Sequence, residues 1–170
     1  DMTNMETMFA VKNLFQKTLN SSYLDSRAKH TYINFENRSN YLFNSGIEGI
    51  EESDLILLIG TNPRFEATIL NSRIRKTYLK NKTEIFSLED VGDLTYPYKV
   101  LENNSKVIEK IIKNEHNLSN KIASAEKPII ILGQSILNSN NGIYIFEELK
   151  RYLTSINKID DATVTLNFYE

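Results

Sequence analysis

The sequence predicts an α/β fold of the Rossmann-like, doubly wound kind, with a mostly parallel sheet and helices on both of its faces. Two apolar runs, residues 55–59 and 129–132, show no alternation, and glycines follow them at Gly60 and Gly133. Such runs are typical of parallel strands that are buried on both faces. Segments with helical spacing lie between and after them, which gives the alternating order of strand and helix.

The first element is expected to be a helix. Thr3 and Glu6 have the spacing of a capping box, so the helix should begin there. Residues 23 and 24 form a possible short strand, and the polar, aromatic stretch up to about Ser45 predicts a long loop. The helix has one apolar stripe, whose members recur every three to four residues: Met8, Val11, Phe15 and Leu19.

A long helix is expected over residues 63–80. Asn62 is a favourable N-cap, and Pro63 is favoured at the first helical position because its missing N–H has no partner there. The segment 64–82 is basic but contains Glu66, which favours a protein contact or solvation over a phosphate partner. We expect Phe65, Ile69 and Ile74 to face the core, and Arg64, Arg73, Arg75 and Lys76 to face solvent or a partner.

The remaining elements follow in order. Residues 83–88 form a plausible second strand, and the stretch 163–170 is either a strand or the start of something longer. A helix around 107–112 should bury Val107, Ile108, Ile111 and Ile112. A helix over 117–125 should bury Leu118 and Ile122. A last helix should bury the apolar residues that recur at three- and four-residue steps, which are Ile143, Phe146, Leu149, Leu153 and Ile156.

We interpret residues 1–170 as a single α/β domain or lobe, and as an internal fragment of a longer chain, because the sequence begins with Asp1 rather than Met. Residues 1–45 would be a helix plus an irregular segment, 46–156 the βα core and 157–170 a tail. A chain of 170 residues with 41% hydrophobic and 25% charged residues is ordinary for one globular domain.

Composition excludes several kinds of chemistry. With no cysteine, the chain has no disulfide, no thiol catalysis and no cysteine-ligated cluster. His30 and His116 are the two imidazoles, which argues against a tight transition-metal site. A net charge of −2 gives no general attraction to nucleic acid, and no apolar run approaches the roughly 20 residues that span a bilayer.

The best candidate site is the turn that contains Gly60, Asn62 and Pro63. It follows a buried strand and precedes a helix, where open α/β sheets bind ligands and free N–H groups favour anions. A purely structural turn, with a glycine, a cap and a first helical proline, explains the same residues. Gly133 and Ser135 could line the same crevice or form a loop that needs small residues. The common phosphate-binding glycine motifs are absent, as are paired catalytic carboxylates.

The chain resembles the family of large iron–sulfur subunits of the respiratory NADH–quinone oxidoreductases, or complex I, in their molybdopterin-oxidoreductase-like region. The likeness covers most of residues 39–156. It is carried above all by the run Gly-Thr-Asn-Pro-Arg-Phe-Glu-Ala at 60–67 and by Asn-Ser-Arg-Ile-Arg-Lys at 71–76, with further segments at 39–59, 91–96 and 127–133.

The resemblance implies a descent from molybdopterin-dependent enzymes, in which a Gly-x-Asn-Pro turn borders the pterin–guanine dinucleotide site. The matching positions are Gly60, Asn62 and Pro63, and Arg64, Gly133 and Ser135 complete a vestigial pocket. In the complex I subunit this domain is understood to have lost the molybdenum cofactor, and the iron–sulfur clusters belong to the preceding part of the subunit. No catalytic residue and no metal ligand is carried over.

The expected function is therefore a cofactor-free scaffold lobe that supports electron transfer from NADH to quinone. Its expected partners are other subunits of the peripheral arm, with no nucleic acid and no membrane insertion. Its expected place is the cytoplasmic face of a bacterial inner membrane or the mitochondrial matrix side. One alternative is a retained nucleotide- or pterin-binding module. Another is a separate nucleotide-dependent enzyme, which the missing acid, base and phosphate motifs argue against.

Overall fold

The computed structural model describes residues 3–24, 38–40, 42–102 and 104–158. The chain divides into two compact units, one formed mainly by residues 1–30 and the other by residues 31–169. The second unit contains the sheet and the predicted site.

The N-terminal unit contains helix α1 (Met5–Asn13), continued by a π-helical turn (Leu14–Thr18). The N-cap is Asn4, whose side chain accepts a hydrogen bond from Thr7 N at 2.9 Å. The capping box predicted at Thr3 is therefore wrong by one residue, because asparagine caps as well as threonine does. Residues 23 and 24 are not in a strand, so that prediction is also wrong.

The second unit is built around a four-stranded parallel sheet in the order β3-β2-β1-β4. The two predicted apolar strands are confirmed as parallel neighbours, with Leu57 beside Ile130. The predicted strand at 83–88 is β2, whereas the two-residue edge strand β3 was not predicted. The strands are β1 (Leu55–Ile59), β2 (Glu84–Ser87), β3 (Lys99–Val100) and β4 (Pro128–Leu132).

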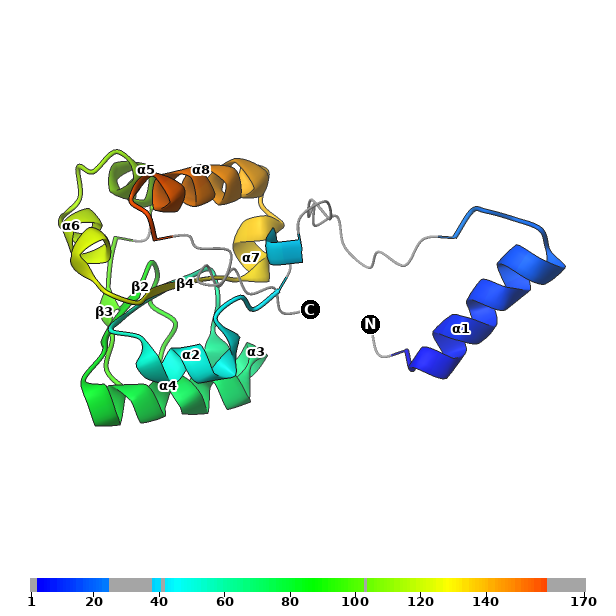
Figure 1. Ribbon diagram of the computed structural model, residues 1–170, viewed down its shortest axis with the longest axis horizontal. Helices are drawn as coiled ribbons and strands as arrows, with labels where there is room; N and C mark the ends of the chain where they lie inside the picture. The colour runs from blue at the N-terminus through cyan, green and yellow to red at the C-terminus, as the bar shows by residue number, and fades with distance from the viewer. Residues whose placement is uncertain (1–2, 25–37, 41, 103, 159–170) are drawn as a thin grey trace. The chain divides into compact units, whose positions relative to one another are not determined.

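Helices cover both faces of the sheet, as the predicted fold class requires (Figure 1). The alternation of β1 divides the core: Leu57 belongs to one apolar cluster, and Ile56 and Leu58 belong to the other. The cluster of Leu57 includes side chains of α5 (Ser105–Ile112), α6 (Asn117–Ser124) and α8 (Gly142–Ser155). The other cluster includes side chains of α2 (Gly46–Glu52) and of α4 (Thr68–Asn81).

The helix predicted over 63–80 is broken into α3 (Pro63–Glu66) and α4. Ala67 separates them with φ −149° and ψ 69°, which is outside the helical region. The break changes which side chains face inward. Phe65 and Ile69, predicted to be inward, are 79% and 70% exposed, whereas Ile74 is buried as predicted.

Two polar residues, Asn71 and Thr77, take inward positions on α4 and bond to distant segments. The Asn71 amide donates to Leu94 O at 3.0 Å and accepts from the Tyr96 hydroxyl at 2.8 Å. The Thr77 hydroxyl donates to the C-terminal turn of α2, at Ile50 O. These bonds hold α2 and the connection between β2 and β3 against α4. The burial of the Tyr96 side chain raises its pKa above the ordinary value.

The later helices follow the predicted pattern with small shifts. Leu118 and Ile122 of α6 are buried as predicted. On α5, Val107, Ile108 and Ile111 are buried, whereas Ile112, also predicted to be buried, is only partly so. Ile143, predicted inward on α8, is 46% exposed, and Ile145 is buried in its place. The short helix α7 (Gln134–Leu137) was not predicted, and the possible strand at 163–170 lies outside the described residues.

Two acidic residues just before β1, Glu51 and Asp54, bond to other elements of the second unit. The Asp54 carboxylate accepts hydrogen bonds from the backbone N–H groups of Glu126 (2.6 Å) and Lys127 (3.0 Å), just before β4. The Glu51 carboxylate pairs with Lys76 and Arg73 of α4. The hydrogen bond from Lys76, and then the one from Arg73, holds the pKa of Glu51 below its ordinary value.

Candidate functional site

The candidate site lies at the carboxyl ends of β1 and β4. The chain leaves β1 through α3 and α4 to reach β2 on one side, while β4 lies on the other side. Open α/β sheets bind ligands at such a change in strand order. The predicted turns at Gly60 and Gly133 meet at this point.

The two glycines allow the backbones to approach closely. Gly60 has φ +62°, a left-handed conformation that favours glycine. Gly133 extends the backbone hydrogen bonding between β1 and β4, because its N–H donates to Ile59 O at 2.8 Å. A Cβ on Gly133 would lie closer than 3.0 Å to the Gly60 carbonyl oxygen and to Thr61 Cβ. The space at Gly133 is thus already occupied by the neighbouring turn.

The start of α7 also packs on Gly60. The Ser135 hydroxyl donates to Gly60 O at 2.5 Å. A Cβ on Gly60 would come closer than 3.0 Å to Ser135 Oγ and to Ile136 Cγ1. The predicted residues Gly60, Gly133 and Ser135 are therefore brought together, and they contact one another.

The side-chain amide of Asn62 both accepts and donates a hydrogen bond within the protein. Its oxygen caps α3 by accepting from Arg64 N at 3.1 Å, and its NH₂ group donates to Val91 O at 2.8 Å. Pro63 is buried at the first helical position, as predicted. Asn62 thus ties the end of β1 to the segment between β2 and β3.

Arg64 extends toward the same segment. Its Nη1 donates to the Asp93 backbone oxygen at 2.7 Å and to the Asp93 carboxylate at 2.6 Å. The pKa of Asp93 is lowered first by the hydrogen bond from Thr95 N–H and then by the Arg64 guanidinium. Both side chains are well exposed, so the ion pair itself contributes little to stability.

Sequence reasoning missed several partners of these residues. Asp93 and Val91 are 29 residues from their partners, and only the turn pattern of Asp93 with Thr95 marks that segment in the sequence. The Thr61 hydroxyl donates to Glu66 at 2.6 Å, and Ile136 lies against Gly60. No sequence motif indicated either contact.

We expect Asn62→Ala to destabilise the protein more than loss of an ordinary cap, which costs about 1 kcal/mol. The variant also leaves Val91 O without its partner, which adds roughly 1 kcal/mol. Asn104→Ala is the matched control, because Asn104 caps α5 through Lys106 N. Urea denaturation measures both. Equal losses of stability in the two variants would contradict the second role of Asn62.

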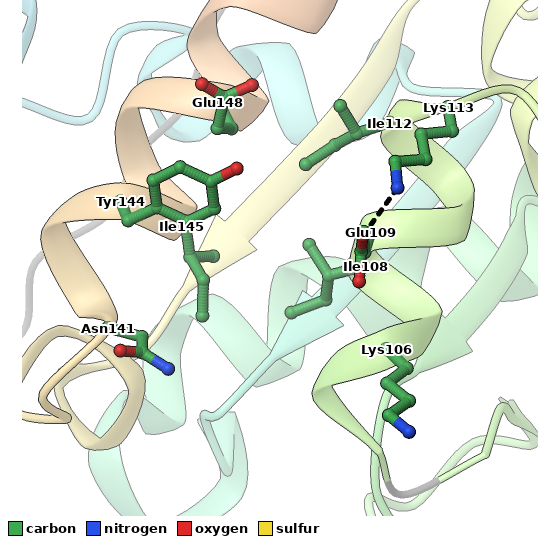
Figure 2. Close-up of a pocket in the computed structure, with 9 residues that line it drawn as sticks. All are labelled: Lys106, Ile108, Glu109, Ile112, Lys113, Asn141, Tyr144, Ile145 and Glu148. Carbon is green, nitrogen blue, oxygen red and sulfur yellow. Dashed lines mark hydrogen bonds and ion pairs between the residues drawn. The ribbon is translucent and has the colours of Figure 1, made fainter.

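A separate pocket of about 240 Å³ lies between α5 and α8 (Figure 2). Ile108, Ile112 and Ile145 form much of its apolar lining. Two of the four charged lining residues, Lys113 and Glu109, pair with each other at 2.6 Å. Their hydrogen bond, and then the attraction of their charges, lowers the pKa of Glu109 and raises that of Lys113. The pocket contains none of the residues of the predicted turns.

Histidine and acidic side chains elsewhere have structural roles. His116 is the N-cap of α6, where its Nδ1 accepts from Leu118 N at 3.1 Å. His30 lies outside the described residues. Within the part of the chain that the structure describes, no three histidine or acidic residues are grouped to hold a metal ion. In the same residues, none of the helices has the length and apolar character to cross a bilayer.

The fold and the site geometry define a doubly wound α/β protein whose strand-end turns face one another. A family model described as molybdopterin oxidoreductase matches residues 1–170, and the chain belongs to this family.

Curated relatives are subunits of one kind of enzyme. The mitochondrial NADH-ubiquinone oxidoreductase 78 kDa subunit of Candida albicans is 37% identical over 149 residues, 86% of this chain and 20% of that protein. The NADH-ubiquinone oxidoreductase 75 kDa subunit of Reclinomonas americana is 34% identical over 88% of this chain and 23% of its own length. An NADH-quinone oxidoreductase subunit from Rickettsia bellii is 31% identical over 94% of this chain and 23% of its own length. These relatives confirm the resemblance that the sequence motifs indicated. The chain spans about a fifth of the length of the curated relatives it matches.

Proposed function

We propose that this chain is a lobe of the large iron–sulfur subunit of an NADH–quinone oxidoreductase, and that it supports electron transfer as a scaffold without carrying a redox centre. The names of the relatives support the membership. The lack of any cysteine is consistent with clusters held elsewhere in the subunit, because such clusters are ligated mainly by cysteine thiolates.

The observation that carries the scaffold role is the mutual packing of the two turns. A ligand at a switch point needs space beside the turn and polar groups directed at it. Here the space beside Gly60 and Gly133 is filled by the chain itself, and Ser135 donates to Gly60 O. The amide of Asn62 is likewise engaged at both ends. We infer that these residues do not fit a pterin–guanine dinucleotide.

The proposed partners are other subunits of the peripheral arm of the same enzyme. The proposed place is peripheral, on the cytoplasmic face of a bacterial inner membrane or on the mitochondrial matrix side. Both follow from the proposed membership in the large iron–sulfur subunit. A lobe of this kind would act through packing, by fixing the positions of neighbouring parts of the enzyme.

A thermal shift titration with guanosine monophosphate and diphosphate tests the proposal. A retained site would add roughly 2.7 kcal/mol of stability with the nucleotide at about 100 times its dissociation constant. We expect no change in melting temperature beyond that caused by inorganic phosphate at equal ionic strength. A saturable rise with nucleotide, absent in the variant Ser135→Ala, would instead support a retained pocket.

Elemental analysis gives a second, independent test. We expect the purified 170-residue chain to contain neither iron nor molybdenum and to show no NADH oxidation above buffer. Hydride and one-electron transfer require a flavin, a cluster or a similar cofactor. Stoichiometric metal in the purified chain would overturn the proposed absence of a redox centre.

A further inference from the structure

The connection between α7 and α8 ends in the single Asn-Gly dipeptide of the sequence, Asn141-Gly142. Glycine has no side chain, so the backbone nitrogen that follows the asparagine is unhindered. That nitrogen can attack the asparagine side-chain amide, and asparagine is one of the thermolabile residues of proteins. The dipeptide is therefore a candidate site of spontaneous covalent modification.

The side-chain amide of Asn141 does not cap the helix that it precedes. Asn141 occupies the N-cap position of α8 and is exposed, yet its side chain forms no cap hydrogen bond. Asn62 and Asn104 differ from it, because their amide oxygens cap α3 and α5. Figure 2 shows Asn141 at the start of α8, with no bond to the other labelled side chains. The amide carbon of Asn141 is thus not held in place by a capping bond.

The packing of α8 on α7 requires glycine at position 142. A Cβ on Gly142 would lie 2.5 Å from Ile136 O and 2.6 Å from Leu137 O. Both are backbone atoms, which cannot move aside as the end of a flexible side chain can. The steric need for glycine therefore keeps a labile dipeptide at the start of α8.

Two backbone hydrogen bonds hold the dipeptide in its folded conformation. The Gly142 N–H donates to Ser139 O at 3.0 Å, and Asn141 O accepts from Ile145 N at 3.0 Å. Attack on the side chain requires rotation about the Cα–C bond of Asn141, whose ψ is 6°. The rotation breaks both bonds. Because helix ends fray, it involves the first turn of α8 rather than the whole fold.

We propose that Asn141 deamidates in the folded protein through opening of the first turn of α8. The Gly142 nitrogen loses its proton to solvent and bonds to Cγ of Asn141. The Cγ–Nδ2 bond breaks, and the nitrogen takes a proton from water and leaves as ammonia. Water then opens the cyclic imide at one of its two carbonyl carbons, which gives aspartate or isoaspartate at position 141. No electron is transferred, and water is the co-reactant.

The two bonds set a limit on the rate. Each backbone hydrogen bond changes the opening equilibrium by about tenfold or less, so the fold slows the reaction by at most roughly a hundredfold relative to an unfolded peptide. Asn138 and Asn140 lie in the same connection and are also exposed, but serine and asparagine follow them, and these side chains hinder attack. We therefore expect Asn141 to react first of the three.

The two products should affect the fold differently. Aspartate at the N-cap favours the helix, because its carboxylate interacts with the free N–H groups and with the helix dipole. Isoaspartate instead inserts a methylene into the backbone before Gly142, where α7 leaves no room. The isoaspartate form should therefore loosen α8, whose residues Leu149 and Leu153 pack in the core.

Incubation of the native full-length protein in heavy-oxygen water, in a mildly alkaline buffer, tests the proposal. A synthetic peptide of residues 136–146 is the unfolded reference. Peptide mapping by mass spectrometry measures conversion at each asparagine, and methylation by an isoaspartyl methyltransferase detects isoaspartate. We expect heavy oxygen and isoaspartate at position 141, at a rate no more than roughly a hundredfold below that of the peptide.

Asn141→Ser should remove both signals and still fold, because serine is a good N-cap. Conversion of Asn138 or Asn140 as fast as Asn141 would overturn the proposal. A rate at Asn141 below the stated limit would also overturn it. So would aspartate formed without isoaspartate, because direct hydrolysis of the side chain gives aspartate alone.

Discussion

Replacing Leu57 with aspartate is expected to lower the amount of assembled enzyme without changing turnover per assembled complex. Leu57 lies in the central strand β1, is 1% exposed and packs in an apolar cluster. A carboxylate placed there has no cation or donor to compensate its burial, so the loss of stability should be several kcal/mol. For a lobe that acts through packing, this loss should appear as failed assembly.

The measurements are the yield of intact complex and the NADH oxidation rate per complex. Ile143→Asp is the matched control, because it adds the same charge at a position that is 46% exposed. It should assemble normally. If Leu57→Asp assembled normally and turnover per complex fell, the scaffold role would be wrong and an active role would have to replace it.

Gly133→Ala is expected to destabilise the protein by about 3 kcal/mol or more, since the added methyl group meets backbone atoms that have no room to move. Gly133 has φ −88°, a conformation open to any residue, so its requirement for glycine is steric. The methyl group would press against Gly60 O and Thr61 and force the ends of β1 and β4 apart.

Gly92→Ala separates the steric effect from the conformational one. Gly92 has φ +77° with no atom within 4 Å of an added Cβ. Its substitution should cost only about 1–2 kcal/mol, from the left-handed backbone alone. Thermal or urea unfolding of the two variants gives the comparison. A Gly133→Ala variant no less stable than Gly92→Ala would show that the two strand ends can separate easily, and that the crevice can open.

The parts of the fold that sequence could predict are those with a local cause. The strands β1 and β4 are predictable because a non-alternating apolar run is favourable only when both faces are covered. The start of α3 is predictable because Asn62 and Pro63 act within one turn of chain. The inward sides of α5 and α6 follow from a regular apolar period.

The errors arise where distant contacts override the local pattern. An unbroken helix would place Phe65 inward, but the break at Ala67 carries no glycine or proline to mark it. Asn71 and Thr77 face inward because partners more than 20 residues away satisfy them. The edge strand β3 has only two residues and depends on pairing with β2.

The candidate site shows the same division. Its position at the strand ends could be predicted, because parallel strands end at the same edge of a sheet. The direct contact of Gly60 with Gly133 depends on the register between β1 and β4, which no local motif specifies. The bond from Arg64 to Asp93 likewise depends on the path of the connection between β2 and β3, which contains no helix.

The Asp54 carboxylate has a consequence for the order in which the protein forms during synthesis. It accepts from the backbone of Lys127, which is 73 residues later in the chain, and β4 begins at the next residue. At translation rates of about 5–20 residues per second, β1 exists for roughly 4–15 s before its second neighbour has been made. Throughout that time one edge of an entirely apolar strand lacks its β4 partner. We therefore expect this strand edge to be open to non-native pairing during the interval, and a pause in translation shortly before residue 128 would prolong it.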